Sequence, residues 1–76
     1  MRPDDWKTIF REKGWLQGNK VVPPAGSRTL FINFLDDRQF GHDQITAITD
    51  RYIETRRAGD SYWYLWKDLV SVRIMP

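Results

Sequence analysis

The chain has 76 residues and a net charge of +2, and 41% of its residues are hydrophobic while 29% are charged. This length predicts one small domain, residues 1–76, and excludes the layered α/β architectures that build most enzyme pockets. The lack of cysteine excludes a disulfide framework, a cysteine-based zinc finger and a thiol nucleophile.

The clearest predicted element is a helix over residues 3–13. Pro3 fixes a backbone angle that suits the first turn of a helix, and acidic residues follow it directly. Trp6, Ile9 and Phe10 then fall at the spacing of one helical face. This pattern predicts an amphipathic helix at the start of the chain.

The helix is expected to end at Gly14, which can adopt a left-handed conformation and let Trp15 fold back onto Phe10. Residues 15–28 are predicted to form an ordered but irregular connector. A Gly-Asn pair within it could bend a short ribbon, and a Pro-Pro pair cannot continue a β-ladder because proline lacks an amide donor.

From residue 29 onward the hydrophobic pattern changes to a period of two, which is typical of strands. Turns are expected at Asp36-Asp37, at Thr49-Asp50-Arg51, at Ala58-Gly59-Asp60 and at Lys67-Asp68. Gly41 is expected to weaken the second strand or to mark a bulge in it. The predicted strands cover residues 29–35, 38–48, 51–57, 61–66 and 70–74.

Residues 43–57 also fit a helix, because Ile45, Ile48 and Tyr52 could share a helical face behind an Asp43 cap. Within this segment, six of eleven consecutive positions are β-branched, which favours strands. The preferred fold class is therefore mainly β: an N-terminal helix and a five-stranded, strongly bent antiparallel sheet that forms a small barrel. The alternative is an α+β domain with a second helix at 43–57.

A helix followed by five short strands in a meander is the element order of the Sm-like fold, a small barrel related in shape to SH3-like barrels. In the bacterial Hfq branch of this family, the last motif carries a Tyr-Lys-His signature. Trp66 and Lys67 match its aromatic residue and lysine, and Asp68 stands where that branch has the histidine. The resemblance covers residues 29–75: residues 30–35, 36–41 and 50–53 resemble the Sm1 motif, and residues 66–72 resemble the Sm2 motif.

The resemblance implies a non-catalytic module that binds single-stranded RNA as a homo-oligomer. Glu54 stands where the family often has an asparagine that contacts RNA, and its carboxylate would repel phosphate and offer a base only acceptors. Another Sm-like relative, a small inhibitor of the transcription terminator Rho, binds a protein. The alternative function is therefore a protein-binding inhibitor or adaptor, which could be encoded by a phage or mobile element and would use the same aromatic surface.

Aromatic residues dominate the strand over 61–66. Tyr62, Tyr64 and Trp66 should face one way, and Trp63 with Leu65 should face the other. One face must be the core, and the other could stack bases or form an interface between copies of the chain. Five basic residues accompany the last three strands: Arg51, Arg56, Arg57, Lys67 and Arg73. Acidic residues lie near them in the sequence, so this pattern also fits an ordinary charged surface.

Turns on either side of the last strands meet at one rim of a closed barrel, so we predict a nucleic-acid-binding site there. Arg51 and Lys67 are expected to contact phosphates, while Tyr52 or Trp66 stacks a base. His42 is the only histidine and is expected to be an exposed turn residue. We expect no catalytic residue, metal or cofactor, and a cytoplasmic protein without a membrane segment.

Overall fold

The computed structural model describes residues 3–76, and its first element is the helix α1 (Pro3–Lys13), as predicted. Gly14 follows with a φ of 74°, the left-handed conformation that ends many helices. The Trp15 amide donates to the Phe10 carbonyl at 2.9 Å, and the two rings meet nearly at right angles with centroids 5.2 Å apart. The predicted return of Trp15 onto Phe10 is confirmed.

After the helix, eight strands and two short 3₁₀ helices make up the rest of the described fold. They are β1 (Leu16–Gln17), β2 (Lys20–Val21), β3 (Thr29–Phe34), β4 (Gln39–Gly41), η1 (His42–Gln44), β5 (Ile45–Ile48), β6 (Tyr52–Arg57), β7 (Asp60–Leu65), η2 (Trp66–Asp68) and β8 (Leu69–Met75). The chain is therefore mainly β with one N-terminal helix, as predicted. The predicted connector contains the β1–β2 ribbon, which turns at its Gly-Asn pair.

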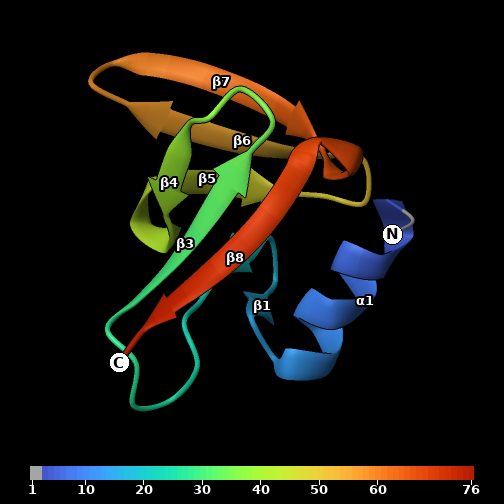
Figure 1. Ribbon diagram of the computed structural model, residues 1–76, viewed down its shortest axis with the longest axis vertical. Coiled ribbons are helices and arrows are strands. Elements are labelled where there is room, and N and C mark those ends of the chain that lie inside the picture. The colour runs from blue at the N-terminus through green and yellow to red at the C-terminus, as the bar shows by residue number, and fades with distance from the viewer. Residues whose placement is uncertain (1–2) are drawn as a thin grey trace.

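The strands form three antiparallel sheets, where the sequence pattern predicts one sheet of five strands. The orders are β1-β2, β4-β3-β8 and β5-β6-β7. In Figure 1 the long strands β3 and β8 run side by side, and the β6–β7 hairpin lies at the end where β8 begins. Helix α1 packs beside η2 at the same corner of the molecule.

The predicted strand over 38–48 is wrong as a single element. It divides into β4 and β5, which belong to different sheets, with η1 between them. The Gln44 side chain bends back so that its Oε1 accepts the Gly41 amide at 3.0 Å, which stabilises this break. Gly41 therefore marks the point where the chain leaves one sheet for another.

The alternative helix over 43–57 is also wrong, because β5 and β6 form an antiparallel pair in this segment. Five of the six β-branched residues that favoured strands lie in β5 or β6, and the sixth, Thr49, lies in the turn between them. Thr55 is fully buried, and its hydroxyl donates to the Tyr62 carbonyl at 3.1 Å. The turn predicted at 49–51 is confirmed, with the Thr49 amide donating to the Tyr52 carbonyl at 2.9 Å.

The core fills the space between the helix and the two larger sheets, and it is rich in aromatic rings. Phe34 from β3 stacks on Tyr64 from β7 with ring centroids 3.8 Å apart. Phe10 from α1 meets Trp66 edge to face at 5.4 Å. These contacts connect the helix and both sheets into one core. Among the described helices, none has the length and apolar character to cross a bilayer.

Candidate functional site

The residues predicted to bind nucleic acid do lie close together. Tyr52 begins β6 and pairs with Leu65, the last residue of β7, so Arg51 lies beside the start of η2, which holds Trp66 and Lys67. The Trp66 indole nitrogen donates to the Thr49 carbonyl at 2.7 Å and ties η2 to the β5–β6 turn. The expected meeting of these two turns is therefore present in the fold.

Trp66 is nevertheless a core residue, which corrects its expected role in stacking a base. Only 4% of its surface is exposed, and its ring packs against Phe10. Its indole N–H is also occupied by the Thr49 carbonyl. Because Tyr64 and Trp66 share a face and both are buried, this face of the aromatic segment belongs to the core. The opposite face is therefore the one that points outward.

The outward residues of the β6–β7 hairpin form the surface that we call the outer face: Tyr52, Glu54, Arg56, Trp63 and Leu65. They alternate with buried or partly buried residues along the two strands. Trp63 is 61% exposed and Leu65 is 48% exposed, and with Tyr52 they place three large apolar side chains on one side of the hairpin. Of the four predicted site residues, only Tyr52 belongs to this surface, while Arg51 and Lys67 border it.

Trp63 is exposed yet held in place by a carboxylate. Its indole nitrogen donates to Glu54 Oε1 at 2.8 Å across the β6–β7 pair. The other oxygen of Glu54 accepts the Thr46 hydroxyl from β5 at 2.8 Å. Three neighbouring strands thus fix the orientation of one exposed ring. The alternation of residues 61–66 identified Trp63 as a candidate, but no sequence signal pointed to its bond with Glu54.

Glu54 has a different role from the one its position suggested. By residue type alone, its carboxylate is expected to oppose RNA binding, because it adds negative charge and offers only acceptors. In the structure both oxygens already accept hydrogen bonds, from Trp63 and Thr46. The negative charge remains on the outer face, while much of the capacity to accept a hydrogen bond from a base is used within the sheet.

The predicted basic cluster divides between different surfaces. Arg51, Arg56 and Lys67 lie on or beside the outer face, and their side chains form no hydrogen bond or ion pair with other residues in the described part of the chain. Arg57 instead lies over the buried Phe40 ring, with its guanidinium carbon 4.3 Å from the ring centroid. Arg73 lies over Phe31 on the other large sheet. Three of the five cations therefore remain available to the outer face.

His42 is partly buried rather than an exposed turn residue. The Leu30 amide lies 3.4 Å from its Nδ1, which accepts this long hydrogen bond. His42 therefore helps to hold η1 against β3, and this use corrects the prediction of a solvated position. Within residues 3–76, no group of three or more potential ligands is arranged to hold a metal ion.

Asp36 joins the β3–β4 turn to β7, a contact that sequence reasoning missed. Its Oδ2 accepts the Tyr64 hydroxyl at 2.7 Å and the Arg38 guanidinium at 2.6 Å. Burial raises the pKa of the Asp36 carboxyl, but the hydrogen bonds from Tyr64 and Arg38 outweigh it and hold that pKa below its usual value of 3.8. This network stabilises the turn beside the aromatic core, and Arg38 also lies over the Tyr62 ring.

The outer face is suited to binding by stacking and by charge. Tyr52 and Trp63 occupy diagonal positions on neighbouring strands, and residues at such positions are about 7–8 Å apart. Arg51, Arg56 and Lys67, which have no ion-pair partner among the described residues, lie on or beside the same surface. No protein-family model matches the sequence, and no curated protein or solved structure matches it.

Proposed function

We propose that the protein is a non-catalytic module that binds single-stranded RNA on its outer face, as a homo-oligomer. The observation that carries this proposal is Trp63, which is 61% exposed while its indole N–H is held by Glu54. An exposed ring that is already fixed loses little conformational freedom when a base stacks on it. Its orientation is set before any ligand arrives.

In this proposal the aromatic rings contact bases and the basic side chains contact phosphates. Trp63 and Tyr52 each stack one base, which contributes about 1–3 kcal/mol per base. Arg51, Arg56 and Lys67 contact phosphates and supply affinity that depends on salt. Stacking tolerates any base because every base has a flat face, so weak sequence preference is expected. The charge of Glu54 limits the affinity without preventing stacking.

We also propose an Sm-like barrel as the architecture behind this function. In support, η1 connects the edge strand β4 of one three-stranded sheet directly to the edge strand β5 of the other. In an Sm-like barrel, β4 and β5 together would correspond to one strongly bent strand. The bend would then lie at Gly41, inside the stretch that resembles the Sm1 motif. The edge strands β7 and β8 each pair on one side only, and they offer the route by which neighbouring copies would add strands.

The test is fluorescence anisotropy with labelled oligouridine and oligoadenosine 12-mers, measured at several salt concentrations. Trp63→Ala should weaken binding by about 5- to 150-fold and leave the salt dependence intact, because it removes stacking alone. Lys67→Ala should weaken binding and reduce the slope of log affinity against log salt by about 1, because it removes a phosphate contact.

Two control variants match these changes. Leu35→Ala truncates another exposed apolar side chain, and Lys13→Ala removes a cation from the helix. Both should leave RNA affinity close to that of the parent. If the parent shows no affinity at low salt, or if Trp63→Ala and Lys67→Ala bind as well as the parent, the RNA proposal fails. The protein-binding inhibitor or adaptor would then become the better account of the outer face.

A further inference from the structure

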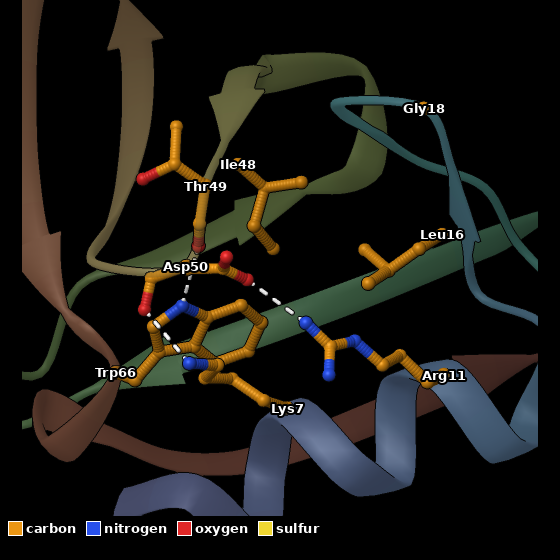
Figure 2. Close-up of a pocket in the computed structure, with 8 residues that line it drawn as sticks. All are labelled: Lys7, Arg11, Leu16, Gly18, Ile48, Thr49, Asp50 and Trp66. Carbon is orange, nitrogen blue, oxygen red and sulfur yellow. Dashed lines mark hydrogen bonds and ion pairs between the residues drawn. The ribbon is translucent and has the colours of Figure 1, made fainter.

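A pocket of about 360 Å³ opens between α1, the β1–β2 ribbon and the end of β5 (Figure 2). Helix α1 contributes Lys7 and Arg11, which reach toward Asp50 in the β5–β6 turn. Leu16 and Ile48 form an apolar side of the pocket. The pocket thus combines cations at one side with an apolar wall at another.

The charges in this pocket favour an anion. Arg11 Nη2 lies 2.8 Å from Asp50 Oδ1, and Lys7 Nζ donates to the Asp50 carbonyl oxygen at 2.9 Å. Arg11 thus faces the Asp50 carboxylate and Lys7 faces the Asp50 backbone carbonyl, so the lining holds two cationic side chains and one carboxylate. A guanidinium has five N–H donors, and a single contact with Asp50 leaves most of them for another partner. A metal ion would meet the two positive side chains and only one carboxylate.

The ion pair between Arg11 and Asp50 can be opened at little cost. The two side chains are 62% and 78% exposed, and exposed ion pairs of this kind contribute little to stability. A phosphate group carries more charge and can accept two parallel hydrogen bonds from one guanidinium. It would therefore displace the Asp50 carboxylate from Arg11.

We propose that this pocket binds the phosphate of a nucleoside monophosphate, and that Asp50 competes with that phosphate for Arg11. The wall of Leu16 and Ile48 offers apolar contact for the base. Gly18 leaves the ribbon side open, since a Cβ built there would meet nothing within 4 Å. The volume lies near the lower end of the range for small-molecule pockets, about 300–1,000 Å³. The same chemistry could come from a free nucleotide or from the 5′ end of an RNA chain.

The test is a titration of the ¹⁵N-labelled protein with AMP, adenosine and inorganic phosphate, followed by NMR. AMP should shift the indole N–H signal of Trp66, which lines the pocket, and should bind more tightly than either of its parts. Arg11→Gln should weaken AMP binding about tenfold, because it removes a charge-assisted hydrogen bond. Asp50→Asn should tighten it by about two- to fivefold, because it removes the competing anion.

Lys13→Gln is the matched control, because it removes the same charge from the same helix without lining the pocket. Its AMP affinity should stay within about twofold of the parent, since exposed charges at a distance are screened by salt. Trp63→Ala should leave AMP affinity unchanged, so this site can hold even if RNA binding on the outer face fails. Thermal melting of each variant checks that the fold is intact.

Two results would overturn the proposal: AMP that leaves the Trp66 signal unmoved, or an Asp50→Asn variant that binds AMP more weakly than the parent. The source of the phosphate is settled by competition against bound AMP. A short RNA with a 5′-phosphate that displaces AMP, while the same RNA with a 5′-hydroxyl does not, supports a site for RNA ends. If neither RNA displaces bound AMP, the result supports a free nucleotide as the ligand of this pocket.

Discussion

The pKa of the Asp36 carboxyl is lowered by its environment, which makes the stability of the fold depend on pH. Burial alone would raise its pKa, but the Tyr64 hydroxyl, the Arg38 amide and the Arg38 guanidinium all donate to the ionised form and lower that pKa. The folded state therefore binds a proton at Asp36 less readily than the unfolded chain does. Such a group stabilises the fold when ionised.

We predict that the stability difference between the parent and Asp36→Asn is largest and constant above about pH 5. It should shrink as the pH falls through the lowered pKa of Asp36, because the carboxylate that Tyr64 and Arg38 recognise is then protonated. Urea unfolding between pH 2 and pH 7 measures this difference. In a Tyr64→Phe background, which lacks one donor to Asp36, the same difference should change less with pH. An equal difference at every pH would contradict the prediction.

Glu54 is a residue whose type looks unfavourable for binding RNA but whose side chain holds the exposed Trp63 ring in place. Glu54 brings negative charge to the surface proposed to bind RNA, and a comparison of residue types alone argues against it. Its hydrogen bond to the indole nitrogen gives it a positioning role that only the cross-strand register reveals. The charge of Glu54 therefore opposes phosphate, while its hydrogen bond favours an ordered Trp63 ring. It is the hydrogen bond that determines the orientation of the ring.

At the scale of elements, two glycines have different physical roles. Gly59 lies in the β6–β7 turn with a φ of +85°, beside Ala58 at +52°, a pair of angles typical of a tight hairpin turn. Gly41 has an ordinary extended φ of −75° at the break between β4 and η1. A Cβ there would lie 2.8 Å from Asp43 Oδ1, at the end of a flexible, exposed side chain.

Gly59→Ala should therefore destabilise the protein by about 1 kcal/mol, because alanine is strained at positive φ. Gly41→Ala should be neutral or stabilise by up to about 1 kcal/mol, since Asp43 can move and the unfolded chain loses freedom. Denaturant unfolding at neutral pH compares the two variants. Adding Asp43→Ala to Gly41→Ala removes the close contact and should not lower stability further. A larger loss for Gly41→Ala than for Gly59→Ala would show that the break at η1 requires glycine itself.

The sequence predicted most elements because their signals are local. The helix needs only its apolar spacing and Gly14, and the turns at 36–37, 49–51 and 58–60 need only short-range turn chemistry. The division of residues 38–48 between two sheets was missed, since it depends on how Gln44 bends back to the Gly41 amide. The burial of Trp66 depends on its packing against Phe10 of α1, and the hydrogen bond from Trp63 to Glu54 depends on the pairing of β6 with β7. Periodicity in one strand cannot report such contacts.

At the scale of the whole molecule, the sheets leave unequal edges. The β1–β2 ribbon contacts the edge strand β5, where the Ile48 amide donates to the Asn19 carbonyl at 2.8 Å. The edge strand β4 has only three residues and runs directly into η1. The other edges, β7 with six residues and β8 with seven, are the long ones. Long edges offer backbone groups that a second copy of the chain can pair with.

We therefore predict a homo-oligomer assembled through β7 and β8, whose mass is a multiple of the 9.1 kDa chain. Val70 on β8 is 52% exposed, and Val70→Lys should shift the population toward monomer because lysine on an edge strand opposes strand addition. Ala25→Lys adds the same charge in an exposed loop outside the sheets and should leave the assembly unchanged. Light scattering behind a sizing column measures all three proteins. A parent that stays monomeric at high micromolar concentration would exclude edge pairing and leave the outer face to act in single copies.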